Sequence, residues 1–145
     1  MINKEAKLSE HFSLGELTNT RHVTPDGNIP SGVVVENLKR LCPWLGELRL
    51  RCKAPIVINS GYRSPAVNKL AGGAGNSNHL TGCAVDIRCA GKEQMIRYAA
   101  ILLDIADGTK QDYDELLLEQ HGSVCWLHFA VRPQGNRRRV GFLKA

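Results

Sequence analysis

The chain has 145 residues, of which 43% are hydrophobic and 23% charged, which fits one folded globular domain better than two. No apolar run approaches the ~20 residues that span a bilayer, and residues 1–7 lack a signal-peptide core, so we expect cytoplasmic synthesis without membrane insertion. The net charge of +5 fits a polyanionic partner, although part of it lies at residues 137–139 and also fits a solvated basic terminus.

The first third of the chain predicts a docking segment, a loop and a helix. Residues 8–17 have the apolar spacing of a short docking segment, and residues 24–32 are dense in the Pro, Gly, Asn, Asp and Ser of a loop. From residue 33 to about 52, apolar residues recur at helical spacing. Pro43 lies inside this pattern and is expected to split or kink the helix, since proline has no N–H to donate.

The remaining elements alternate. Residues 64–82 are rich in Gly, Asn and Ser and predict one short helix plus a loop, whereas residues 91–106 predict an amphipathic helix that Gly108 ends. Short strands are predicted at residues 55–59, 84–87, 115–119 and 124–131. This order of predicted helices and strands indicates one α+β domain, residues 1–145, with a small, largely antiparallel sheet flanked by helices.

The cysteines indicate what the domain lacks. The five, an odd number without a CxxC pair, predict neither a disulfide framework nor an all-cysteine zinc site. We expect them to be reduced and mostly buried. They are Cys42, Cys52, Cys83, Cys89 and Cys125.

His79 and Asp86 are the first candidate metal ligands. They lie seven residues apart, and Gly82 between them lets the backbone reverse, so the imidazole can lie above the strand face that carries the carboxylate. Taken alone, such a pair is more often hydrogen-bonded than metal-bound. His128, in an apolar strand, is a third candidate, and two histidines with one carboxylate form the ligand set of a catalytic zinc.

A hydrolytic zinc site also needs a general base. Glu119 ends the strand before the one with His128, and its carboxylate reaches the same pocket if the two strands pair. Glu115 is a rival, because Glu115 and Glu119 share a strand face. For either acid, the alternative is a solvent-facing position at a strand end.

Several motifs in this order resemble the zinc D-alanyl-D-alanine peptidase family, in particular its short single-domain branch of bacteriophages and bacteria. The chain reads SGYRSP at residues 60–65, NSNHLTGCAVD at 76–86 and WLH at 126–128, with Asn68 and Gly72-Gly73 between the first two. Residues 8–17 and 114–119 also resemble that branch. The resemblance covers nearly the whole chain.

The resemblance implies the Hedgehog/DD-peptidase fold, in which helices flank a small antiparallel sheet and one zinc ion lies in a cleft. The family's metal ligands carry over to His79, Asp86 and His128, the same residues reached above. Its carboxylate-binding arginine carries over to Arg63, whose guanidinium can hold a substrate carboxylate in a bidentate manner.

The resemblance also implies roles for two further residues, and at one position the chain differs from the family. Ser77 would hold substrate or orient His79, and Trp126 would form a cleft wall, unless it is a buried core residue. Many larger relatives place an acid three residues before the last histidine ligand, where this chain has Cys125. The base must then come from elsewhere, for which the short branch suggests Glu119, and Cys125 indicates either lost activity or a thiol near the metal.

The expected function is a monomeric zinc peptidase acting on bacterial peptidoglycan, cleaving a D,D-bond or an L-alanyl-D-glutamate bond. The size and basic charge suit a phage endolysin that a holin releases, or a virion-associated wall hydrolase. One alternative is an inactive zinc-containing module that binds peptidoglycan or serves as a phage structural part. Nucleic-acid binding through residues 137–139 is a third reading, which we do not favour.

Overall fold

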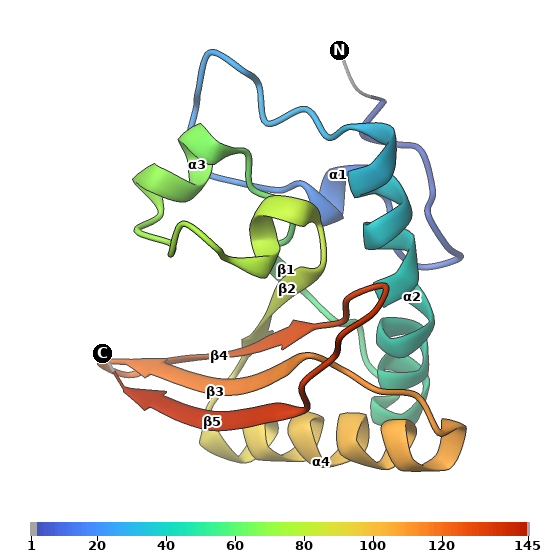
Figure 1. Ribbon diagram of the computed structural model, residues 1–145. Helices are drawn as coiled ribbons and strands as arrows, with labels where there is room; N and C mark the ends of the chain where they lie inside the picture. The colour runs from blue at the N-terminus through green and yellow to red at the C-terminus, as the bar shows by residue number, and fades with distance from the viewer. Residues whose placement is uncertain (1–2, 145) are drawn as a thin grey trace.

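The computed structural model describes residues 3–144 and places five strands in one sheet, with helices packed around it (Figure 1). The helical segments are α1 (Leu14–Leu17), α2 (Gly32–Cys52), α3 (Pro65–Leu70), the 3-10 helix η1 (Asn78–Thr81) and α4 (Lys92–Thr109). The strands are β1 (Ile58–Ser60), β2 (Ala84–Cys89), β3 (Glu115–His121), β4 (Val124–Ala130) and β5 (Arg139–Lys144). In the part described, no helix has the length and hydropathy needed to cross a membrane.

The strand order is β1-β2-β4-β3-β5, and every pair of neighbours is antiparallel except β3 and β5, which run parallel. The prediction of an α+β fold with a small, largely antiparallel sheet is therefore confirmed. The register places Asp86 of β2 and Leu117 of β3 on either side of His128 of β4. Since strand side chains alternate, one face of the sheet carries Asp86, His128, Glu115 and Glu119.

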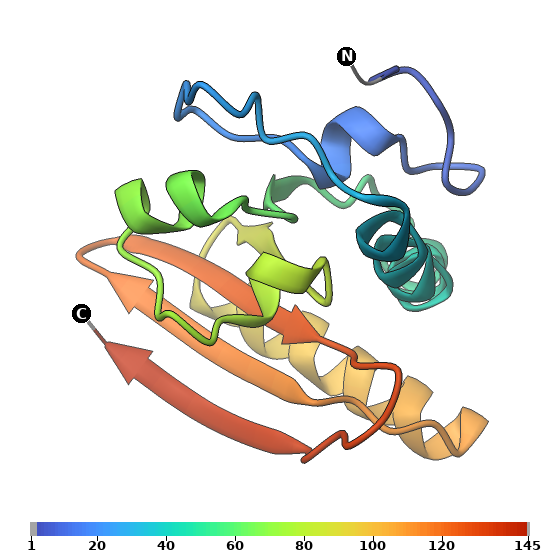
Figure 2. The ribbon, with the colours of Figure 1, turned by 45° about the horizontal axis from the view of Figure 1, so that its top comes forward.

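The opposite face of the sheet forms the core with α2 and α4. Figure 2 shows α4 lying along this face, and Trp44 of α2 reaches Phe129 of β4 with ring centroids 5.2 Å apart. Helix α2 continues through Pro43, so the predicted split is absent. Both Pro43 and Lys39, whose carbonyl loses its helical donor, lie on the exposed side, where water can solvate that oxygen.

Several elements differ from the sequence prediction, and one of them is α4, which continues through Gly108 to Thr109 and has Lys110 as its C-cap instead of ending at Gly108. The first strand covers Ile58–Ser60 rather than residues 55–59, and its pairing with β2 is irregular between Ile58 and Ser60. Residues 64–82 contain two helices, α3 and η1, rather than one. Strand β5 was not predicted at all, because it is short and contains Gly141, and Leu143 follows Phe142 directly, so its apolar residues do not alternate strictly with polar ones.

Candidate active site

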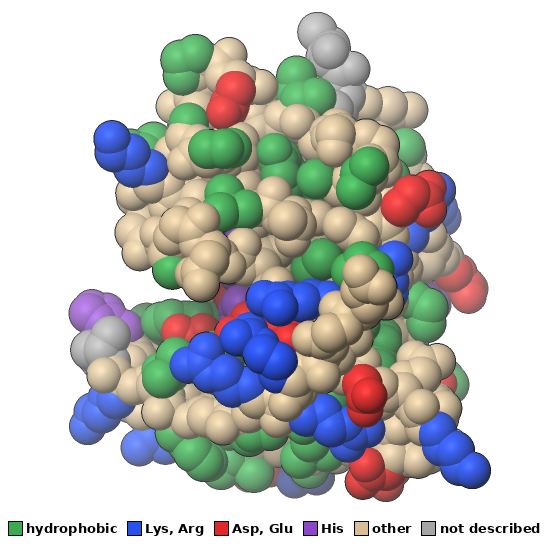
Figure 3. Space-filling model, viewed as in Figure 1, with side chains coloured by type: hydrophobic (Ala, Val, Ile, Leu, Met, Phe, Trp, Pro, Cys, Tyr) green, Lys and Arg blue, Asp and Glu red, His purple; other side chains and the backbone are tan. Residues whose placement is uncertain are grey.

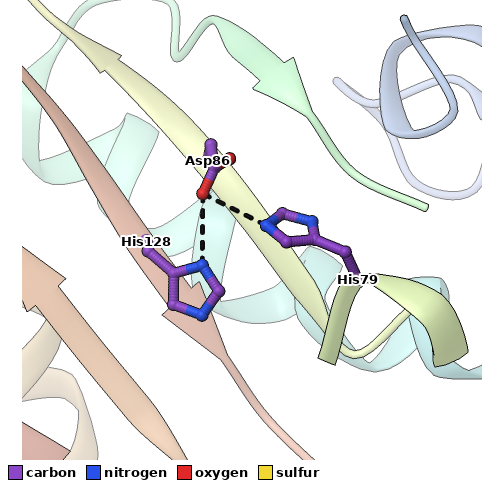
Figure 4. Close-up of side chains that lie close together, drawn as sticks. All are labelled: His79, Asp86 and His128. Carbon is purple, nitrogen blue, oxygen red and sulfur yellow. Dashed lines mark hydrogen bonds and ion pairs between the residues drawn. The ribbon is translucent and has the colours of Figure 1, made fainter. Parts of the chain in front are cut away.

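Three buried side chains from separate segments converge above the sheet: His79 from η1, Asp86 from β2 and His128 from β4 (Figure 4). His79 Nε2 and His128 Nδ1 each lie 3.2 Å from the same oxygen, Asp86 Oδ1. One atom from each residue lies within 4.8 Å of the others, and the three form a group that could hold a metal ion. The structure therefore brings together all three predicted ligands.

The turn between η1 and β2 places His79. Ser77 caps η1, its hydroxyl accepting the His79 backbone N–H at 3.1 Å, so this serine orients the segment that carries the histidine. Gly82 ends η1 in the left-handed region, with φ +75°, and a Cβ there would lie 2.8 Å from Val34. Only glycine fits both requirements, which agrees with the reversal expected at this position.

The remaining ring nitrogen of each histidine has its own partner. His79 Nδ1 donates to the carbonyl oxygen of Gly61 at 2.7 Å, and His128 Nε2 donates to Glu115 Oε1 at 3.0 Å. These hydrogen bonds turn His79 Nε2 and His128 Nδ1 toward Asp86. Metal-binding histidines in proteins are usually held in this way, by a carbonyl or a carboxylate on the second nitrogen.

The donor set fits a divalent cation such as zinc. With its proton on Nδ1, His79 points the Nε2 lone pair at a carboxylate oxygen, and two such acceptors repel each other unless a cation lies between them. Four ligands at ~2.0 Å around a tetrahedral ion lie about 3.3 Å from one another. Both nitrogen-to-oxygen distances at Asp86 are 3.2 Å, which suits such an ion, and all three ligand atoms lie within 4.8 Å of one another.

Charge reinforces this arrangement. Burial by itself would raise the pKa of Asp86, but His79 and His128 outweigh it and hold that pKa well below its usual range. Burial would lower the pKa of His128, but its hydrogen bonds to Asp86 and Glu115 raise it to about 9. A histidine that binds a metal ion must be neutral. A metal ion on His128 Nδ1 would therefore take the place of the proton that Asp86 and Glu115 stabilise on this ring.

The structure separates the environments of the two candidate bases. Glu115 is buried and accepts hydrogen bonds from His128 and from Asn78 Nδ2, and the bond from His128 is the main cause that lowers its pKa to about 2. Glu119 lies further along β3, opposite Trp126 in the register. Burial, and then the charge of Asp86, raise the pKa of Glu119. Glu115 is thus bonded to a candidate metal ligand, whereas the pKa of Glu119 is shifted in the opposite direction.

A cleft of about 380 Å³ opens over the three candidate ligands. Figure 3 shows it as a hollow where acidic and histidine side chains lie beneath a group of basic ones. Glu119 and the partly exposed Trp126 line it, so the predicted place of Trp126 as a cleft wall agrees with the structure better than a core position does.

Arg63 also lines the cleft, but much of it is engaged with the protein. Its Nη2 donates to Asp86 Oδ2 at 3.1 Å and its Nε to Ser60 Oγ at 3.0 Å, so it holds the carboxylate oxygen that the histidines leave free. Its proposed contact with a substrate carboxylate stays a prediction.

Cys125 does not lie near the candidate metal site. Its buried side chain belongs to the core cluster, on the face of β4 opposite His128, because the two residues are an odd number of positions apart on one strand. The alternative of a thiol near the metal is therefore wrong. All five cysteines are free, and four are buried, as predicted.

Sequence reasoning missed Asp114, which is fully buried beside the cleft. Asp114 Oδ2 accepts from Arg137 Nη2 and Asn78 Nδ2, each at 2.8 Å, and Arg132 Nε lies 3.2 Å away. Burial raises the pKa of Asp114, but the hydrogen bonds from Arg137 and Asn78 outweigh it and lower the pKa to about 2. Arg132 and Arg137 are remote in sequence from Asn78, so only the fold could reveal this contact.

We expect Asp114→Asn to lower the free energy of unfolding by about 2 kcal/mol at pH 7, since a lowering of nearly two pKa units is worth about that much. A lowered pKa stabilises the fold fully above the unfolded value near 3.8 and loses this effect as pH falls toward 2. Urea unfolding of both proteins between pH 7 and 3 should show the difference shrinking below pH 4. Asp112→Asn, an exposed acid on the same loop, is the control, and a pH-independent difference would contradict the account.

Comparison with known proteins adds one match. The model of the family described as Peptidase M15 matches residues 10–114, a range that includes His79 and Asp86 and ends before β3. No curated protein matches the chain.

Proposed function

This chain belongs to the Peptidase M15 family, and from that premise we propose that it is a zinc-dependent peptidase that cleaves peptide bonds in bacterial peptidoglycan. The observation that supports this most directly is the pair of 3.2 Å contacts that His79 Nε2 and His128 Nδ1 make with Asp86 Oδ1. The second nitrogen of each ring is already bonded elsewhere. In this proposal the three residues hold one zinc ion.

Zinc bound there supplies Lewis acidity, which polarises a peptide carbonyl and makes water more acidic. Glu119 accepts a proton from the attacking water at its carboxylate and returns it to the leaving amine. Burial and then the charge of Asp86 raise the pKa of Glu119, a direction that favours its accepting a proton as a general base. Glu115 takes no part in this proton transfer and instead orients His128 through Nε2.

Arg63 and Trp126 would act on the substrate side of the cleft. Each guanidinium nitrogen of Arg63 already donates one hydrogen bond, with Nη2 fixing Asp86, so only the second N–H of Nη1 and of Nη2 can hold a peptide carboxylate. Trp126 offers an apolar wall next to Glu119, which helps to keep bulk water away from the proton that Glu119 moves. Ser77 acts through His79 by capping its segment.

The wall substrate and the setting belong to the proposal as well. A D,D-bond or an L-alanyl-D-glutamate bond both fit the expected chemistry. We propose that the protein acts on the wall as a monomer, either as a phage endolysin after holin-dependent release or as part of a virion. The wall is polyanionic, which agrees with the net charge of +5.

An inactive zinc-containing module is the second candidate, and the structure weakens its main argument. That argument was that Cys125 occupies the position where larger relatives have an acid. The Cys125 side chain lies in the core, however, and Glu119 provides a carboxylate that lines the cleft. A module of this kind would bind metal and peptidoglycan without turnover.

Digestion of purified peptidoglycan by the zinc-loaded protein tests the proposal. We expect soluble fragments whose new amino and carboxyl ends, identified by mass spectrometry, define the bond. The signal should disappear on chelation and return with zinc. A zinc-loaded protein that binds peptidoglycan and releases no new ends would favour the inactive module.

A further inference from the structure

Three arginines from the segment after β4 reach the cleft: Arg132, Arg137 and Arg139. Figure 3 shows basic side chains gathered at the mouth of the hollow, above acidic ones. All three lie beyond residues 10–114, which the family model matches, so they belong to the part of the chain that the match does not describe. The mechanism proposed above uses none of them.

Buried carboxylates hold two of these arginines from below. Arg137 donates from Nε to Asp114 Oδ1 at 3.0 Å and from Nη2 to Asp114 Oδ2 at 2.8 Å. Arg139 donates from Nη1 to Glu115 Oε2 at 3.2 Å. The arginine side chains nevertheless remain 49% and 54% exposed, whereas Asp114 is 0% exposed and Glu115 11%. Arg137 is therefore held by two side-chain hydrogen bonds and Arg139 by one, and both residues line the cleft with about half of each side chain exposed.

These groups keep hydrogen-bond donors for a ligand. A guanidinium has five N–H groups. Within residues 3–144, Arg139 uses one nitrogen in hydrogen bonds and Arg137 two, whereas Arg63 uses all three and its side chain is only 15% exposed. The donors most available to an anion thus lie on the β5 side of the cleft rather than at Arg63.

The same side of the cleft is electropositive and close to the candidate metal ligands. Arg132 and Arg137 both pair with Asp114, so two guanidinium groups share one carboxylate there. Glu115 connects the arginines to the candidate metal ligands, since its Oε1 accepts from His128 Nε2 at 3.0 Å while its Oε2 accepts from Arg139. One carboxylate group therefore separates Arg139 from a residue of the metal site.

We propose that Arg137 and Arg139 form a carboxylate-binding subsite, which makes the enzyme selective for peptides with a free carboxylate close to the bond that is cleaved. This inference rests on the proposed peptidase function and narrows its substrate class. Planar guanidinium groups bind carboxylates through paired, charge-assisted hydrogen bonds, and a carboxamide cannot replace the charge.

The test uses two wall peptides that differ only in having free side carboxylates or their carboxamides. For the zinc-loaded protein we measure kcat/KM on both and, by calorimetry, their dissociation constants. We expect the wild type to prefer the carboxylate form about ten- to a hundredfold in both measurements. Arg139→Gln should bring that ratio to within about threefold, and Arg139→Lys, which keeps the charge without the planar fork, should lie between.

Arg138 provides a matched control in the same segment. It lies between the two proposed residues but turns away, donating to Asp112 Oδ1 at 2.6 Å and lying over the ring of Tyr113. Arg138→Gln removes the same charge and should leave the preference for the carboxylate form as in the wild type. If Arg138→Gln lowers the preference as much as Arg139→Gln does, overall charge rather than a subsite is responsible and the proposal fails.

The two measurements separate this inference from the proposed function. If both peptides are cleaved and bound equally well, the subsite is wrong while the peptidase activity stands. If neither peptide is cleaved but the carboxylate form binds more tightly, and Arg139→Gln abolishes this, the subsite stands and the peptidase activity is wrong.

Discussion

Asp86→Asn should weaken zinc binding on the order of a thousandfold, because it removes the one charged ligand, to which both histidines are aligned. Asn keeps the size of the side chain, so the cavity is unchanged. We expect dialysed protein to retain about one zinc ion per chain in the wild type and almost none in the variant. Peptide release from peptidoglycan should fall with it, to the rate without enzyme.

Two further proteins make this result decisive. Asp104→Asn changes an exposed acid on α4 and should retain zinc, which controls for charge and handling. Asp86→Asn also removes the negative charge that Arg63 Nη2 pairs with, so circular dichroism must accompany the metal analysis to show that the variant is folded. If Asp86→Asn does not fold, His79→Gln tests the same site from η1. A folded variant that keeps one zinc ion and full activity would contradict the assignment.

Glu119→Gln should lower kcat on the order of 10²- to 10⁴-fold while zinc content stays the same, because the amide cannot accept the proton of the attacking water. Glu119 lines the cleft and makes no hydrogen bond to His79, Asp86 or His128, so its replacement leaves the candidate ligands in place. Single-turnover digestion of a wall peptide, with metal analysis of the same sample, measures both quantities.

Glu115→Gln gives the opposite pattern if the two acids have the roles proposed here. Glu115 contacts His128 Nε2, and loss of such a partner weakens metal affinity about 10- to 100-fold. At saturating zinc, Glu115→Gln should therefore recover much more activity than Glu119→Gln does. The reverse result, in which Glu115→Gln is inactive with zinc bound and Glu119→Gln is active, would make Glu115 the base.

Much of the candidate site follows from the sequence because its spacing has a local geometric meaning. His79, Gly82 and Asp86 lie within eight residues, and a left-handed glycine between a short helix and a strand brings imidazole and carboxylate together. Helix α2 and the strands that carry Asp86 and His128 were also predictable from apolar periodicity. The motifs that resemble the zinc D-alanyl-D-alanine peptidases are likewise short continuous stretches, so they can be recognised without knowledge of the tertiary structure.

What the sequence left open depended on contacts between distant segments. The choice between Glu115 and Glu119 could not follow from strand alternation, which places both on one face. In the structure Leu117 is the residue paired with His128, both acids lie two residues from it along β3, and Glu115 is the one that accepts from His128 Nε2. Strand β5 has no buried face, and its position beside β3 depends on backbone pairing that the residue pattern does not encode.

The sequence by itself determined the α+β class, the order of most elements and the three candidate metal ligands. Only the tertiary structure decided that the basic C-terminal segment is part of the cleft, where Asp114 and Glu115 hold Arg137 and Arg139. The physical reason is that periodicity reports which face of an element is buried. The pairing of charges from segments more than 20 residues apart depends on how those segments pack, which periodicity does not report.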